Sequence, residues 1–252
     1  MSIWAIGDLH LAFSNPSKDM SFFGHPWENY AEKIEAHWIN CIQKEDIVLI
    51  PGDICWANNL ENAKIDLEWL EKLPGTKVIS KGNHDYWWAS NAKMEANLPP
   101  SIHFIHNNAV HLHVQGKKIA FGGTRLWDCT EYDFMPFITF KQNPRARKES
   151  TPPTEEQTLE IFKKEQERLR ISLKCMDPNA DYKIALIHYP PIGASLLPST
   201  TSDILEEFKV DICVFGHLHN VKENTLPFGS VNGTKYVFTS ADYLDFKPIK
   251  IL

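Results

Sequence analysis

Five short polar blocks constrain the fold of this 252-residue chain more than any other feature. Each block directly or almost directly follows a short apolar run of the kind that forms a buried strand. In chain order, the blocks are Gly7-Asp8-Leu9-His10, Gly52-Asp53, Gly82-Asn83-His84-Asp85, His188-Tyr189-Pro190-Pro191 and Gly216-His217-Leu218-His219. Because α/β domains gather their sites at the carboxyl ends of strands, we expect these blocks to converge on one site.

The apolar runs alternate with amphipathic stretches, which is typical of an α/β domain. A capping box at Thr154 predicts the start of a long helix, and Asn232-Gly233 predicts a hairpin. We expect further helices at residues 30–41 and 59–73. Strands are expected at residues 2–6, 47–50, 77–80, 103–105, 110–114, 118–121, 183–187, 210–215 and 236–239. No linker or internal repeat divides the sequence, so we expect a single domain over residues 1–252.

The residue types in the blocks are those of a metal site. In an extended segment residues i and i+2 point to the same side, so Asp8 and His10 can converge on one ion. The pair His217 and His219 can likewise reach neighbouring ions. Carboxylate, amide and imidazole without thiolate suit divalent Mn, Fe, Co or Zn rather than an all-sulfur zinc site. A single aspartate could instead cap a turn, but that alternative does not explain a whole set of donors at strand ends.

In this order the blocks resemble the DxH, GD, GNH[DE], H and GHxH pattern of the calcineurin-like metallophosphoesterase superfamily. The resemblance runs from Asp8 to His219 and so covers most of the chain. It implies a four-layer αββα sandwich with two mixed β-sheets. It also implies two divalent metal ions as cofactors.

The resemblance implies a role for each matching residue. The first metal would be held by Asp8, His10 and His219, and Asp53 would bridge both ions. The second metal would be held by Asn83, His188 and His217. A hydroxide held between the ions would attack phosphorus in line with the leaving oxygen.

The resemblance also makes His84 the general acid that protonates the leaving group, with Asp85 positioned to orient it. Asp85 could instead cap a helix that begins near Trp87.

Substrate contacts must come from outside the blocks. Arg125 follows a predicted strand and could grip a phosphate oxygen, although a surface arginine paired with an acid is an equal alternative. The stretch 124–153 lacks periodicity and contains several aromatic residues and a basic run at 141–148. We expect it to form a cap over the metals, with Trp87 and Trp88 as stacking surfaces; the alternative is that the aromatics form a satellite core.

These features favour an enzyme that hydrolyses a phosphate mono- or diester of a small molecule. The lack of arginine after Gly52-Asp53, and Asp85 in place of glutamate, weaken the phosphoprotein phosphatase alternative. Tyr189 stands where some cyclic-nucleotide phosphodiesterases have a second histidine, and this difference weakens that narrower assignment. A net charge of -6 argues against a nuclease and against nucleic acid as a partner. A metal-binding scaffold is a further alternative, but every ligand position is filled.

The sequence also suggests a compartment. It has no secretory signal pattern and no apolar run of the roughly 20 residues that a membrane span needs, so we expect no membrane partner. The five cysteines are odd in number and lack CxxC pairing, which is typical of reduced thiols. We therefore predict a cytoplasmic protein.

Overall fold

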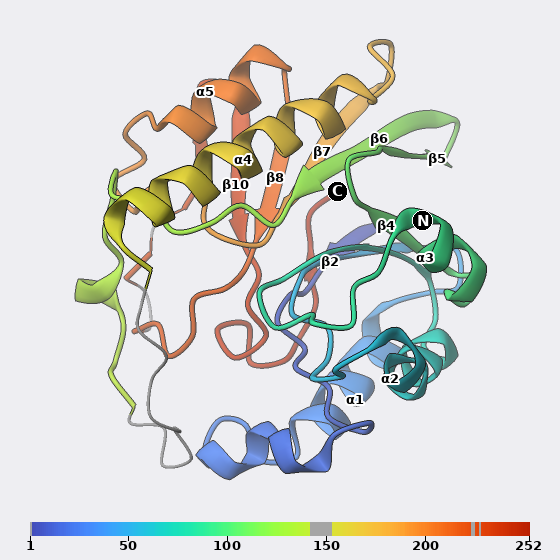
Figure 1. The fold of residues 1–252 in the computed structure, drawn as a ribbon. Helices are drawn as coiled ribbons and strands as arrows, with labels where there is room; N and C mark the ends of the chain where they lie inside the picture. The colour runs from blue at the N-terminus through green and yellow to red at the C-terminus, as the bar shows by residue number, and fades with distance from the viewer. Residues whose placement is uncertain (1, 142–152, 223–224, 227) are drawn as a thin grey trace.

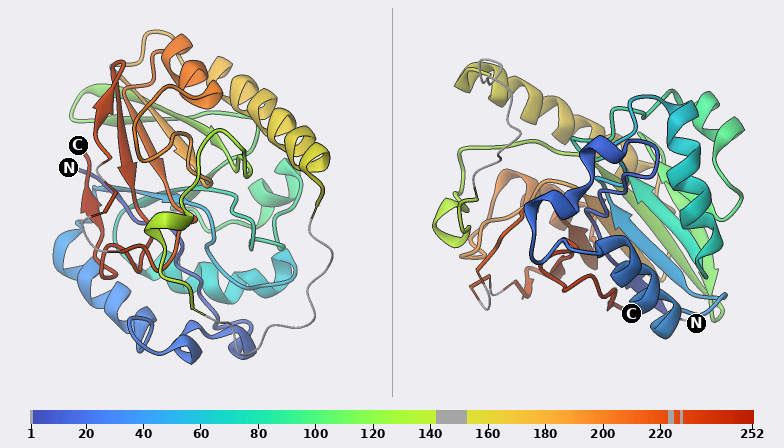
Figure 2. Two further views of the ribbon diagram at one scale, coloured as in Figure 1. Left: turned by 90° about the vertical axis from the view of Figure 1, so that its left-hand side faces the viewer. Right: turned by 90° about the horizontal axis from the view of Figure 1, so that it is seen from below.

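Two mixed β-sheets form the centre of the protein, with helices on their outer faces (Figures 1 and 2). The computed structural model describes residues 2–141, 153–222, 225–226 and 228–252. The first sheet has the order β11-β1-β2-β3-β4, in which only the β1–β11 pair is antiparallel. Its strands are β1 (Ile3–Ala5), β2 (Ile47–Pro51), β3 (Thr76–Ser80), β4 (Ile102–Ile105) and β11 (Ile249–Lys250).

The second sheet has the order β5-β6-β7-β8-β10-β9, with antiparallel pairs at both edges and parallel pairs between them. Its strands are β5 (Val110–Val114), β6 (Lys117–Thr124), β7 (Tyr182–Ile187), β8 (Ile212–Phe215), β9 (Ser230–Val231) and β10 (Thr234–Phe238). The mixed pairing in both sheets confirms the fold class predicted from the sequence.

The central strands are apolar on both faces because each face is covered. In β2, Ile47 and Leu49 face the core between the sheets, where they meet residues of the second sheet such as Leu186. The alternate residues Val48 and Ile50 pack against the helices on the other face. The result is the four-layer αββα arrangement.

The outer layers consist of α1 (Tyr30–Cys41), α2 (Leu60–Lys72) and α3 (Asn91–Asn97) on the first sheet, and α4 (Glu155–Lys174) and α5 (Thr200–Glu207) on the second. The Thr154 capping box opens α4 as predicted. The buried face of α4 includes Phe162, Leu169 and Leu173, whereas Leu159 is 49% exposed. Within the described residues, no helix combines the length and apolar character needed to cross a membrane.

The sequence did not predict α3, α5 or β11. Seven and eight residues give α3 and α5 too little length for a periodic signal, and α3 buries only Met94. Three short 3₁₀ helices, Pro16–Lys18, Met20–Phe23 and Met135–Phe137, were also not predicted.

Candidate metal centre

All seven predicted metal ligands lie at the carboxyl ends of central strands. Asp8 and His10 follow β1, Asp53 follows β2 and Asn83 follows β3, all in the first sheet. His188 follows β7, and His217 and His219 follow β8, in the second sheet. An isolated bridge between Gly7 and Ser240 links the segments after β1 and β10 at this edge. Ligands far apart in the chain are therefore brought together by the pairing of strand ends.

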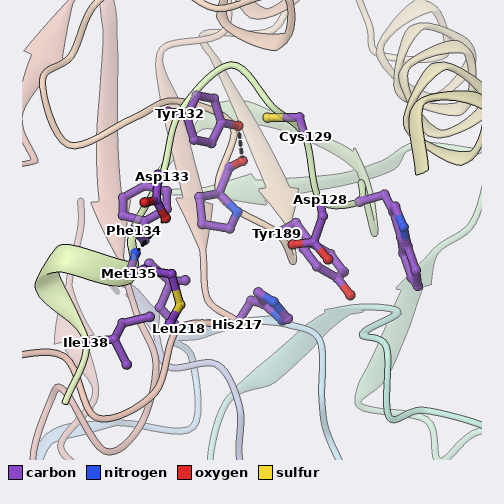
Figure 3. A pocket seen from close by; sticks show the side chains of 12 residues that line it. Asp128, Cys129, Tyr132, Asp133, Phe134, Met135, Ile138, Tyr189, His217 and Leu218 are labelled. Carbon is purple, nitrogen blue, oxygen red and sulfur yellow. Dashed lines mark hydrogen bonds between the residues drawn. The ribbon is translucent and has the colours of Figure 1, made fainter. Parts of the chain in front are cut away.

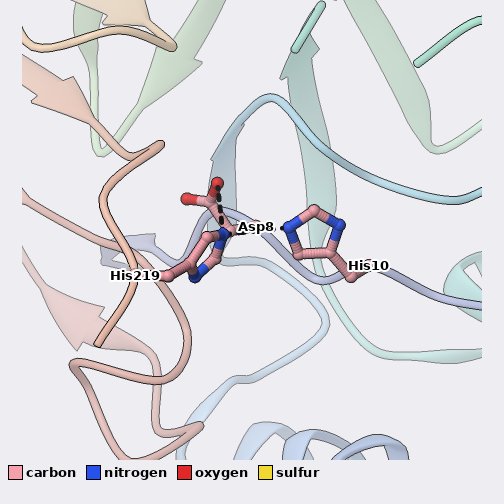
Figure 4. A group of neighbouring side chains, drawn as sticks. All are labelled: Asp8, His10 and His219. Atoms are coloured by element: carbon pink, nitrogen blue, oxygen red, sulfur yellow. Dashed lines mark hydrogen bonds and ion pairs between the residues drawn. The ribbon is translucent and has the colours of Figure 1, made fainter. Parts of the chain in front are cut away.

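The first group of ligands contains Asp8, His10 and His219, as predicted (Figure 4). Nε2 of His10 lies 3.0 Å from Nε2 of His219, and this His219 atom lies 3.7 Å from Oδ1 of Asp8. Oδ2 of Asp53 is 3.6 Å from Nε2 of His10 and 3.5 Å from Nε2 of His188. This places Asp53 between the first group and the residues expected around a second ion.

The second group is built around Asn83. Its Oδ1 lies 2.7 Å from Nε2 of His188 and 3.0 Å from Nδ1 of His217. Asp8, Asp53 and His188 also have ligand atoms within 4.8 Å of one another. The two groups are therefore neighbours that share carboxylates.

The hydrogen bonds on the outer side of the histidines show that this donor set fits metal ions. Nδ1 of His188 is 3.0 Å from the carbonyl oxygen of Pro51, so Nδ1 carries the proton and Nε2 presents a lone pair to the oxygen of Asn83. Nδ1 of His219 similarly donates to Asp242 at 2.9 Å. A metal ion among these facing atoms would meet the requirement of their lone pairs for a positive partner.

The electrostatics of the site agree with this requirement. Burial is the main cause that raises the pKa of Asp8 to about 8; the charge of His219 opposes this rise and the charge of Asp53 adds to it. Burial also lowers the pKa of His188 to about 3 and that of His10 and His217 well below the usual value, so their lone pairs are free. The site thus places the neutral imidazoles of His10, His188 and His217 beside the buried carboxyl groups of Asp8 and Asp53.

The ligands also have an uncommon backbone conformation. Asp8, His10, Asp53 and His217 have φ values of 54°, 48°, 51° and 73°, in the left-handed region that non-glycine residues rarely adopt. A Cβ at Gly216 would lie 2.0 Å from Oδ2 of Asp8, so this block needs glycine for close approach. Such strain persists only where the surrounding structure enforces it, and it concentrates at functional sites.

A family model described as calcineurin-like phosphoesterase matches residues 1–221, a span that contains all seven ligands. The chain belongs to the calcineurin-like phosphoesterase family. No curated protein matches it. Hydrolysis of phosphoesters with the help of divalent metal ions is the general activity of this family.

Solved structures similar to this calcineurin-like phosphoesterase include three from different organisms. The phosphopantetheinyl hydrolase of Mycobacterium tuberculosis is 13% identical, with a TM-score of 0.52, over 100% of this chain and 95% of that one. The protein of unknown function AQ665 from Aquifex aeolicus is 14% identical, with a TM-score of 0.48, over 99% and 95%. GAP50, the anchor in the inner membrane complex of Plasmodium, is 15% identical, with a TM-score of 0.48, over 96% and 72%. At these identities the likeness concerns the fold alone.

His84 lies beside the metal ligands of this phosphoesterase. Its backbone N–H donates to Oδ1 of Asp53 at 2.8 Å, and its ring centroid is 5.6 Å from that of His10. The Trp56 ring packs against it at 4.4 Å. Nδ1 of His84 is buried and has no hydrogen-bond partner within the described residues.

The structure corrects both interpretations of Asp85. Its carboxylate makes no hydrogen bond to the His84 ring within the described part of the chain. It accepts instead from the backbone N–H groups of Gly82 and Ile54 at 2.8 and 2.9 Å and from the Trp87 indole at 2.9 Å. No helix begins near Trp87, because residues 86–87 form a turn. Asp85 therefore links the loop after β2 to the loop after β3 by hydrogen bonds. It helps to position His84 through the backbone of the second loop.

Arg125 is paired with an acid, which was one of the two alternatives. Its guanidinium lies 3.2 Å from Oε1 of Glu165 and stacks on Trp127 at 4.5 Å. Forty residues separate the two partners. The ion pair does not exclude a contact with substrate, because Arg125 remains 21% exposed.

The expected cap at 124–153 is described only in part, since residues 142–152, with most of the basic run, lie outside the described residues. Tyr132, Phe134 and Phe137 pack against the core around α4 and α5, as in the satellite-core alternative. Trp87 is 1% exposed and offers no stacking surface, which corrects that expectation.

A cavity of about 250 Å³ adjoins the second metal group (Figure 3). The loop after β6 lines it with Asp128 and other residues, and Tyr189 and His217 belong to its lining too. The rings of Tyr189 and His217 are 3.8 Å apart. The loop that was expected to form a cap thus contributes a wall next to a metal ligand.

Sequence reasoning missed several residues that support the ligands. Asp242 fixes His219, Ser240 donates to Oδ2 of Asp8 at 2.9 Å, and Trp56 stacks on His10 at 5.0 Å. Ser240 and Asp242 follow β10, so the same signal of polar residues after an apolar strand could have identified them. Trp56 has no such signal.

Proposed function

We propose that this chain is a dinuclear-metal phosphohydrolase that cleaves a phosphate mono- or diester of a small molecule. The observation that carries the proposal is the convergence of seven donors into two adjoining groups with Asp53 between them. Divalent Mn, Fe, Co or Zn ions bound there would neutralise phosphoryl oxygens and make a water molecule nucleophilic at neutral pH.

The protein's own residues have three tasks in this proposal. The hydrogen bonds of His188 and His219 to Pro51 and Asp242 hold the imidazoles in the tautomer that presents Nε2 to the centre. His84 donates a proton to the leaving oxygen. Burial lowers the pKa of His84 and the charge of Asp53 raises it, so a bound phosphate would raise it further in the direction that a general acid requires.

The cavity beside His217 supports a small-molecule substrate. Its aromatic walls and the Asp128 carboxylate suit the organic part of an ester, with the phosphate held at the metal centre. A cytoplasmic location is also proposed, and all five cysteines are free, as expected in a reducing compartment.

The test is hydrolysis of p-nitrophenyl phosphate and its bis ester by metal-stripped protein, with Mn, Fe, Co, Ni, Zn or Mg restored one at a time. Turnover that depends on metal and is lost in Asp53→Asn supports the proposal. The ratio of the two esters distinguishes monoesterase from diesterase activity. Two bound ions without turnover on any phosphate ester would favour the scaffold alternative.

A further inference from the structure

A second, smaller cavity lies between the ends of β4 and β6 and helix α4. Its volume is about 160 Å³, and it is lined by residues that include Lys81, His106, Arg125, Glu165 and Arg168. Lys81 directly precedes the Gly82-Asn83 block, and the charge of Arg125 acts on both Asp53 and His188. Two of its lining residues, Lys81 and Arg125, therefore lie close to predicted metal ligands.

The charges around this cavity are unbalanced. Three cationic side chains, Lys81, Arg125 and Arg168, surround the single carboxylate of Glu165. Glu165 is 2% exposed and already accepts three hydrogen bonds. Its Oε1 receives Arg125 at 3.2 Å and Arg168 at 2.5 Å, and its Oε2 receives the Thr124 hydroxyl at 2.7 Å. The carboxylate thus holds the two guanidinium groups in place and has little capacity left for a third cation.

Lys81 is the cation without a direct partner. Among the described residues, its ammonium group makes no hydrogen bond and no ion pair, although the side chain is partly buried. The charges that act on it include Arg125 and Arg168 as well as Asp85 and Glu165. Nε of Arg125 is also buried without an acceptor. A partly buried positive cluster with spare donors is stabilised when an anion binds to it.

From this geometry we propose that the cavity formed by Lys81, Arg125 and Arg168 around Glu165 is an oxyanion-binding subsite. It takes a phosphate-type group beside the one held at the metal centre. Ligand cavities for whole small molecules usually exceed roughly 300 Å³, so this one suits a single charged group. If this oxyanion belongs to the substrate, the substrate carries two anionic groups, either two phosphates or a phosphate and a carboxylate. That substrate assignment rests on the proposed function, whereas the binding of an oxyanion does not.

Binding of inorganic phosphate to the metal-loaded protein tests the subsite directly. Calorimetric titration should detect two phosphate sites in the parent protein. Lys81→Met and Arg168→Gln should each weaken phosphate binding at one of these sites by about tenfold, and the metal content should stay the same. Arg170→Gln is the matched control, because Arg170 lies on the same helix and pairs with Glu207. Unchanged binding in both variants, or the same loss in Arg170→Gln, overturns the proposal.

A kinetic comparison identifies the source of the oxyanion. If it belongs to the substrate, KM for adenosine 3′,5′-bisphosphate should rise about tenfold in Lys81→Met, and KM for adenosine 5′-monophosphate should stay within about twofold. If the site takes free phosphate, the calorimetric effect appears without this difference in KM. A protein that hydrolyses no ester but still binds phosphate in a Lys81-dependent way would contradict the proposed function and support the subsite.

Discussion

The two β-sheets supply different chemistry to the metal centre. Three oxygen donors, Asp8, Asp53 and Asn83, follow strands of the first sheet, which also supplies His10. The second sheet supplies only imidazoles, from His188, His217 and His219. Each group nevertheless draws on both sheets, since His219 lies with Asp8, and His188 with Asn83. Metal ions bound there would therefore link the two sheets, because the first sheet supplies carboxylates and the second supplies imidazole lone pairs.

The largest effect is expected from the one carboxylate that lies between the two groups. Asp53→Asn removes a negative charge from both, so activity should fall about a thousandfold or more, equivalent to several kcal/mol of transition-state stabilisation. His217→Asn leaves the first group intact and should cost less. Steady-state hydrolysis of p-nitrophenyl phosphate measures both variants. An equal loss of activity in Asp53→Asn and His217→Asn would contradict the proposed difference between the two sheets.

His84→Ala should come next, because it removes the proposed general acid without removing a predicted metal ligand. We expect kcat to fall by about 10²–10⁴-fold on phenyl phosphate and by less on p-nitrophenyl phosphate, whose leaving group needs less protonation. The number of bound ions should not change. Equal losses on the two esters would contradict the role of His84.

Asp242→Asn tests whether the carboxylate beside His219, a residue of the second sheet's side of the site, contributes to metal binding. Loss of the negative charge that accepts from Nδ1–H of His219 should weaken metal binding by about 10–100-fold. Competition with a fluorescent chelator measures this affinity. Asp203→Asn, an exposed acid in α5, is the control and should bind metal like the parent.

Removal of the metals should make stability depend on pH in a definite direction. Burial raises the pKa of Asp8 to about 8 and that of Asp85 to about 7; for His219 the lowering effect of burial is outweighed by Asp242, and its pKa rises to about 9. These groups bind protons more tightly in the folded state, whereas the histidines with a lowered pKa have the opposite effect near pH 6.5. Unfolding free energy should therefore fall as pH rises from about 7.5 to 9, where those histidines are deprotonated in both states.

Scanning calorimetry of the chelator-treated protein measures this trend. The metal-loaded protein should lose less stability over the same range, because the ions compensate the ionised carboxylates. A metal-free protein that becomes more stable from pH 7.5 to 9 would contradict the electrostatic account of the site.

The smallest effect is expected at the cavity beside His217. Burial raises the pKa of Asp128, whose carboxylate has no hydrogen-bond partner within the described residues. Asp128→Asn should raise KM by about tenfold or less for esters whose organic part carries N–H donors, and leave p-nitrophenyl phosphate unaffected. Comparison of adenosine 5′-monophosphate with p-nitrophenyl phosphate measures this. A similar change on both would place Asp128 outside substrate recognition.

The sequence predicted the ligands of the metal centre because each is part of a short local pattern at a strand end. Asp8 and His10, for example, are adjacent enough for their spacing alone to suggest a shared ion. The αββα fold came from the same blocks through the family resemblance. Strand and helix bounds were predicted from periodicity, which failed for the short helices α3 and α5.

Roles that depend on contacts between distant segments could not be predicted. Asp85 lies beside His84 in the sequence, yet its carboxylate accepts a hydrogen bond from the backbone N–H of Ile54 in another loop. Arg125 meets Glu165 only because α4 packs on the second sheet. Asp242 supports His219 across 23 residues. Local sequence shows which residue types are present, whereas their partners are set by packing.

The number of metal ions bound per chain tests the central claim most directly. After dialysis against Mn, Fe, Co or Zn and removal of excess metal, elemental analysis should find two ions per chain in the parent protein and fewer in Asp53→Asn. One ion or none in the parent, with every one of these metals, would contradict a dinuclear centre shared by the two sheets.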